Sequence, residues 1–121
     1  MNCAKNYVSV ICEYNPFHLG HLYHIEQTRK HGATHIVAIM SGNFVQRGDF
    51  AVQEKYSRAA TAVMGGADLV LELVFPYCAL SAPSFAEAAM RILSSIGVCG
   101  AIAFGSEVAS KEDLLLCAER L

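Results

Sequence analysis

The chain has 121 residues, of which 54% are hydrophobic, and its formal net charge at pH 7 is −2. This length suits one ordinary domain, and the nearly balanced charge provides no basic surface of the kind that attracts nucleic acid. No uninterrupted apolar stretch approaches the roughly 20 residues of a membrane span, and the N-terminus lacks a signal-peptide pattern, so we expect a cytoplasmic protein without a membrane partner.

Five cysteines are scattered along the chain: Cys3, Cys12, Cys78, Cys99 and Cys117. Their odd number and the lack of any CxxC pair do not suit a disulfide framework. Most of them stand in apolar runs. This pattern predicts buried, reduced thiols in a cytosolic protein.

Short apolar runs alternate with segments of helical periodicity from residue 7 onward. The Val- and Ile-rich run 7–14 is too short for a helix and predicts a buried strand. Residues 20–31 predict a helix that a glycine ends, and residues 34–40 predict the second strand. A long polar loop over 41–51 follows. Helical spacing then resumes over 53–64, until a pair of glycines closes it.

The second half of the chain repeats this alternation. Residues 67–73 predict a third strand, and a helix is expected from Ser84, an N-cap with a glutamate three residues on, to about residue 96. Residues 99–105 predict the fourth strand, and Ser110 caps a last helix. Such alternation is typical of βαβ crossovers. We therefore predict an α/β fold, a Rossmann-like doubly wound parallel sheet with helices on both faces.

The ends of two predicted strands should form one ligand site. In a doubly wound sheet, ligands bind outside the carboxyl ends of the strands, where the strand order reverses. The stretch EYNPFHLGHLYH follows the first strand, and Gly105 ends the fourth. If the first strand is central, these two places face one another across a crevice.

Three histidines within this stretch, His18, His21 and His24, have three competing explanations. His21 and His24 share a helical face and could bind a metal, but no familiar zinc spacing such as HExxH is present. Alternatively, the start of the helix offers N–H groups to a phosphate, Gly20 lets the backbone approach it, and the imidazoles add donors. In the third explanation one or more of the histidines simply packs or is solvated, above all His24.

The motif HLGH at 18–21 matches the HxGH signature of the nucleotidyltransferase superfamily. Longer strings resemble, in order, the N-terminal region of the tRNA(Met) cytidine acetate ligase family over about residues 7–107: EYNPFHLGHLYH, MSGNFVQRGDFA, EKYSRA, GADLVLELVFPY and FGSE. Leu19 stands where that family often has Asn, and ELVFP replaces the usual ELP. The resemblance implies a sheet of the HxGH nucleotidyltransferase type. It also implies a single ATP-binding domain over 1–121, truncated relative to the full-length family protein.

The resemblance further implies an enzyme that converts acetate and ATP to acetyl-adenylate and then acetylates the wobble cytidine of elongator tRNA(Met). Its expected partners are ATP, acetate and, through the full-length protein, tRNA(Met). Mg²⁺ is expected with ATP, held mainly by the phosphates, and no metal site of the protein itself is expected. Two further ATP contacts of the family lie past Leu121, so this chain alone should be weakly active or inactive.

The functional residues carried over from the family lie in the motif stretch and at one distant glycine. His18 and His21 are the expected catalytic residues. The ATP-binding set comprises Ile11, Cys12, Glu13, Tyr14, Asn15, Pro16, Phe17, His18, Leu19, Gly20, His21, Leu22, Tyr23, His24 and Gly105. Arg47, in the loop after the second strand, and Lys55 and Arg58, on the next helix, are candidate anion-binding residues. An exposed helical face is the more ordinary explanation for the last two.

The expected chemistry needs no general base. Acetate is already ionised at pH 7, since carboxylic acids have a pKa of roughly 4. The obstacle is instead the repulsion between acetate and the α-phosphate, which donors from His18 and His21 would offset. Two other functions stay open: another HxGH adenylyl- or cytidylyltransferase, although no ISSTxxR signature is present, and a non-catalytic nucleotide-binding fragment.

Overall fold

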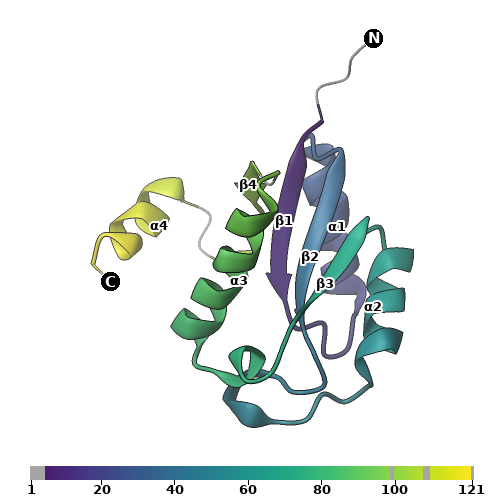
Figure 1. The fold of residues 1–121 in the computed structure, drawn as a ribbon. Helices are drawn as coiled ribbons and strands as arrows, with labels where there is room; N and C mark the ends of the chain where they lie inside the picture. Colours follow the sequence, from purple (N-terminus) through teal and green to yellow (C-terminus); the bar gives the residue numbers. More distant parts are fainter. Residues whose placement is uncertain (1–4, 99, 108–109, 121) are drawn as a thin grey trace.

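The computed structural model describes residues 5–98, 100–107 and 110–120. Within them, four strands form one parallel sheet in the order β3-β2-β1-β4 (Figure 1). The strands are β1 (Tyr7–Cys12), β2 (His35–Ser41), β3 (Leu69–Leu73) and β4 (Ala101–Ile102). The first strand is internal, which meets the condition for a shared site, and the strand order reverses beside it. The predicted parallel α/β fold is confirmed.

Helices form the connections between the strands and cover both faces of the sheet. In Figure 1, α1 and α2 lie on one side of the strands and α3 lies on the other. The helices are α1 (Leu19–Lys30), α2 (Lys55–Met64), α3 (Ala82–Ile96) and α4 (Lys111–Ala118), with the short 3₁₀ helices η1 (Gln46–Gly48) and η2 (Tyr77–Ala79). Within the described parts of the chain, none of the helices has the length and apolarity needed to cross a membrane.

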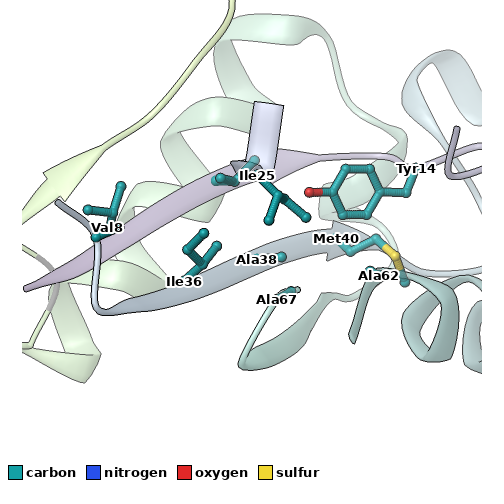
Figure 2. Close-up of a cluster of buried hydrophobic side chains, with 10 residues drawn as sticks. Val8, Tyr14, Ile25, Ile36, Ala38, Met40, Ala62 and Ala67 are labelled. Atoms are coloured by element: carbon teal, nitrogen blue, oxygen red, sulfur yellow. The ribbon is translucent and has the colours of Figure 1, made fainter. Parts of the chain in front are cut away.

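Alternate side chains of β2 enter two separate hydrophobic cores. Ile36 and Met40 pack with residues of α1 and α2, and Figure 2 shows their side chains together with Ile25 of α1. Val37 and Ile39 pack on the opposite face with residues of α3. A strand that is buried on both faces has a nearly continuous apolar sequence. This explains why apolar and polar residues do not alternate in the sequence of β2.

One predicted helix start is wrong. Helix α3 begins at Ala82 with Ser81 as its N-cap, so Ser84 lies inside the first turn. Pro83 favours this earlier start because the first turn of a helix does not need its missing N–H group. The predicted end is correct: Gly97 follows α3 in the left-handed conformation with φ 72°.

The fourth strand and the cysteines also differ from prediction. Strand β4 contains only Ala101–Ile102, so Gly105 lies in the loop after it rather than at its end. Of the cysteines, Cys78 is buried as predicted, Cys12 is half-buried, and Cys117 is exposed on α4, where burial was expected. The predictions for Cys3 and Cys99 lie outside the described residues.

Candidate functional site

A pocket of about 610 Å³ opens at the carboxyl ends of β1 and β4. Its wall combines the last residues of β1, the turn after it, the first turns of α1, and the loop after β4. One residue each from η1 and α3 completes it. The lining residues are Val10, Ile11, Cys12, Glu13, Tyr14, Asn15, Pro16, His18, His21, His24, Gln46, Phe85, Ala103, Phe104 and Gly105. The structure thus brings the histidine stretch and Gly105 to one crevice.

Part of the predicted ATP-binding set lies away from this pocket. Of the predicted residues, all of which the structure describes, Phe17, Leu19, Gly20, Leu22 and Tyr23 do not line it. Leu19 and Tyr23 are 81% and 63% exposed on α1. In contrast, five residues that line the pocket were not in the predicted set: Val10, Gln46, Phe85, Ala103 and Phe104. The FGSE string next to predicted strand four was the only signal for Phe104.

The two motif histidines cap the first turn of α1 together. Their rings stack, with centroids 3.7 Å apart. His18 is the N-cap, and its Nδ1 accepts the backbone N–H of Gly20 at 3.1 Å. In return, Nδ1 of His21 accepts the backbone N–H of His18 at 3.2 Å. The pair reproduces with imidazoles the reciprocal bonds of a capping box.

These caps determine which ring nitrogen of each histidine carries the proton. A nitrogen that accepts a hydrogen bond is unprotonated, so a neutral ring in this arrangement is protonated at Nε2. His18 and His21 therefore each keep one Nε2–H donor, and both rings line the pocket. The geometry favours two neutral donors rather than two imidazolium cations.

Gly20 is required by the fold of the motif itself. A Cβ at this position would lie 2.9 Å from Cε1 and 3.1 Å from Nδ1 of His18. A Cβ contact of 2.9 Å is shorter than real Cβ atoms show. Any larger residue at position 20 would therefore displace the His18 ring from its capping position. The glycine makes room for the capping imidazole, a reason different from the predicted approach of a ligand to the backbone.

The aromatic rings of Tyr14 and Phe17 pack against the ring of His21. Its ring centroid lies 4.8 Å from that of Tyr14 and 5.6 Å from that of Phe17. Burial, with smaller contributions from the charges of His18 and His24, lowers the pKa of His21 below its ordinary value of 6.5. Burial likewise lowers the pKa of His24. Both rings are therefore neutral at pH 7.

We expect the free energy of unfolding to fall as the pH drops below about 6.5. His21 and His24 bind protons less tightly in the folded chain than in the unfolded chain. The unfolded state therefore gains protons first, and stability falls until the pH reaches the lowered folded-state values. Urea unfolding between about pH 8 and pH 5 measures this slope. A variant with both histidines changed to Gln should flatten the slope, and an unchanged slope in that variant would contradict the assignment.

A thiol nucleophile is not part of this site. Burial raises the pKa of the Cys12 thiol to about 12, and its Sγ donates to the carbonyl of Ile39 at 3.5 Å. Because the thiolate is the reactive form of cysteine, Cys12 is unreactive at neutral pH. Nor do the residues that the structure describes include a group of three or more His, Cys, Asp or Glu side chains that could hold a metal ion.

The loop between β2 and α2 is fastened to the turn after β1. The carboxylate of Glu13 accepts the N–H of Gln46 at 2.8 Å, and the side-chain oxygen of Asn15 accepts the N–H of Val52 at 2.7 Å. Tyr14 stands between these two acceptors with φ 47°, a left-handed conformation that non-glycine residues rarely adopt. Its fully buried ring helps to hold the turn in this conformation.

The three candidate anion-binding residues occupy different environments. Arg47 is exposed in η1 and does not line the pocket, although its neighbour Gln46 does. Lys55 pairs with Glu72 of β3 at 2.7 Å, and this hydrogen bond raises the pKa of Lys55. Arg58 is fully buried, so the more ordinary of its two explanations, an exposed helical face, is wrong. Its guanidinium donates to backbone carbonyls instead.

A separate hollow of about 550 Å³ lies between η2 and α3. Its lining is mainly apolar, and its two charged residues, Glu87 and Arg91, pair with each other at 2.8 Å. An apolar lining with a neutralised ion pair does not suit a polyanion. The histidine-lined pocket is therefore the candidate functional site.

Comparison with known proteins relates this chain to one group of enzymes. The family described as HIGH Nucleotidyl Transferase matches residues 5–121. A tRNA(Met) cytidine acetate ligase of Acetivibrio thermocellus is 50% identical over 101 residues, which are 83% of this chain and 24% of that protein. One of Anoxybacillus flavithermus is 45% identical over 115 residues, which are 94% of this chain and 28% of that protein.

A solved structure extends the similarity to three dimensions. Thermotoga maritima TmcAL bound with alpha-thio ATP superimposes with a TM-score of 0.88 at 42% identity. The superposition covers 94% of this chain and 28% of that one. The chain thus spans about a quarter of the length of the relatives it matches.

Proposed function

Since this chain belongs to the HIGH nucleotidyl transferase family, and within it groups with the tRNA(Met) cytidine acetate ligases, we propose that it is the ATP-binding, acetate-activating part of such a ligase. The observation that carries the proposal is the pair of stacked imidazoles at the start of α1. Both rings have Nδ1 engaged in a helix cap, and both line a pocket of about 610 Å³. That volume is within the range of small-molecule sites.

In the proposed first step, a carboxylate oxygen of acetate attacks the α-phosphorus of ATP. The bond from the α-phosphorus to the bridging oxygen breaks, so pyrophosphate leaves and acetyl-adenylate forms. No proton moves, because acetate is already ionised. Negative charge grows on the non-bridging oxygens of the α-phosphate, and Nε2–H groups from His18 and His21 would donate to them.

In the proposed second step, the exocyclic amine of the wobble cytidine in elongator tRNA(Met) attacks the acetyl carbonyl. The amine loses one proton, and AMP leaves. We assign tRNA contacts to the part of such a protein that corresponds to the other three-quarters of the relatives' length, because this chain has nine Lys and Arg against eleven Asp and Glu. A cytoplasmic location follows from a tRNA substrate.

Among the described residues, Glu13 supplies the carboxylate of the pocket lining, and one of its oxygens already accepts the N–H of Gln46. We propose that Mg²⁺ enters with ATP and is held mainly by phosphates and water, as is usual for this ion.

Acetate-dependent exchange of labelled pyrophosphate into ATP tests the proposed function. It should be run on this chain and on a protein of its relatives' length that contains it. We expect exchange in the longer protein and weak or no exchange in the chain alone. Exchange that requires a phosphorylated acceptor instead of acetate would indicate another adenylyltransferase. ATP binding without any exchange in the longer protein would indicate a nucleotide-binding module.

A further inference from the structure

Arg58, near the start of α2, is fully buried, although arginine side chains are rarely found in protein interiors. Its guanidinium donates to four backbone carbonyls. Nη1 donates to Glu13 at 2.6 Å and Nε to Gln53 at 3.0 Å, while Nη2 donates to Ser41 at 3.1 Å and to Gly42. One side chain thus joins three segments: the turn after β1, the end of β2 and the residues before α2.

The position of these carbonyls explains why an arginine is needed. The carbonyls of Glu13 and Gly42 lie just past the ends of β1 and β2, that of Ser41 belongs to the last residue of β2, and that of Gln53 precedes α2. Each buried carbonyl without a partner would cost about 1–3 kcal/mol. A guanidinium offers five donors in a rigid fork and can serve several carbonyls at once. The ion pairs found among the described residues do not include Arg58. Its charge is met by the carbonyl dipoles and, beyond ion-pair distance, by the carboxylates of Glu13 and Glu54.

Arg58 works alongside the two bonds that fasten the β2–α2 loop. The Gln46–Glu13 and Val52–Asn15 bonds join the same two segments from the pocket side. Arg58 joins them from the interior, through the carbonyls of Glu13 and Gly42. The turn that these bonds hold leads directly to His18.

We propose that Arg58 is a positioning residue for the nucleotide site. Its guanidinium locks the turn over 13–16 against the loop over 42–53, and the turn in turn sets the position of His18 at the pocket. Arg58 does not touch the ligand. The role of the site as a nucleotide site rests on the proposed function, whereas the locking of the two segments is a property of the unliganded chain.

The test compares Arg58→Lys and Arg58→Met with the matched control Arg29→Lys. Arg29 also donates to two carbonyls, those of Thr34 at 2.5 Å and Gly66 at 2.9 Å. These carbonyls lie before the amino ends of β2 and β3, whereas the pocket lies at the carboxyl ends of the strands. A lysine keeps the charge and loses the fork. The two readouts are hydrogen exchange of the Gln46 and Val52 amides and the Kd for ATP by calorimetry.

We expect Arg58→Lys to speed exchange of both amides at least about tenfold, because the loop then opens more often. The Kd for ATP should rise about tenfold or more in the same variant. Arg29→Lys should lower the midpoint of unfolding and leave both readouts unchanged. If Arg58→Met fails to fold, the two readouts in Arg58→Lys alone test the positioning role.

Wild-type exchange and affinity in Arg58→Lys would overturn the proposal. The same holds if the variant only lowers the midpoint of unfolding, as a purely structural arginine would. If the wild-type chain binds no ATP, the proposed function has failed in this chain, and amide exchange alone decides whether Arg58 locks the two segments.

Discussion

In a protein of the relatives' length that contains this chain, replacing His18 with Asn is expected to lower the rate of acetate-dependent pyrophosphate exchange about 100-fold or more while the fold is retained. Asparagine is among the best N-cap residues, so its side-chain oxygen can take over the Gly20 N–H. It cannot reach the place where Nε2–H of His18 lies. The variant therefore keeps the helix cap and removes the Nε2–H donor, and only the donor should affect stabilisation of the phosphate.

His21→Gln makes the same separation at the second ring. Glutamine at the third helical position reaches back to the N-cap N–H in an ordinary capping box, so the bond to His18 can be kept. The exchange rate should again fall about 100-fold, with a midpoint of urea unfolding close to wild type. His31→Gln, at the exposed far end of α1, is the control and should change neither quantity. Exchange within a few-fold of wild type in both folded motif variants would remove the phosphate role.

Gly65→Ala is expected to destabilise the chain by about 1–3 kcal/mol and to weaken ATP binding, although Gly65 does not line the pocket. A Cβ at Gly65 would lie 2.6 Å from Cζ and 2.8 Å from Cε1 of Phe17. The backbone itself would accept alanine, because φ is −77°. The displaced Phe17 ring is the one that contacts His21 and Tyr14, so the position of the imidazole should change with it.

Urea unfolding and calorimetry with ATP measure the two effects. Gly100→Ala is a suitable control, because a Cβ there would meet no atom within 4 Å. Wild-type stability and affinity in Gly65→Ala would show that Phe17 moves aside freely. The aromatic contacts would then not be what holds His21.

Local pattern was enough to predict the sheet and the crevice that the histidine stretch and Gly105 share. The apolar runs that became β1, β2 and β3 are short and separated by helical periodicity, and the first two are rich in Val and Ile. This pattern favours parallel strands joined by helices. The predicted fourth strand, 99–105, is longer than β4, because pairing with β1 stops where the chain turns toward the pocket. Ala103 still donates to the carbonyl of Ser9 at 2.8 Å, and Phe104 and Gly105 then line the site.

Features that depend on contacts between distant residues could not be predicted. Helical periodicity treats Arg58 as a surface position, and its burial follows from carbonyls of residues 13, 41 and 42, which only the folded sheet brings together. The contact of Gly65 with Phe17 is of the same kind. Even the role of Gly20 required coordinates, since it depends on the rotamer of the His18 ring.

The most direct test of the account is ¹⁵N NMR spectroscopy of the histidine rings at neutral pH, with and without ATP. We predict that His18 and His21 are neutral, protonated at Nε2 and unprotonated at Nδ1, and that ATP shifts their Nε2 signals while that of His31 stays in place. Rings protonated at Nδ1, or Nε2 signals of both motif histidines that do not respond to saturating ATP, would contradict it.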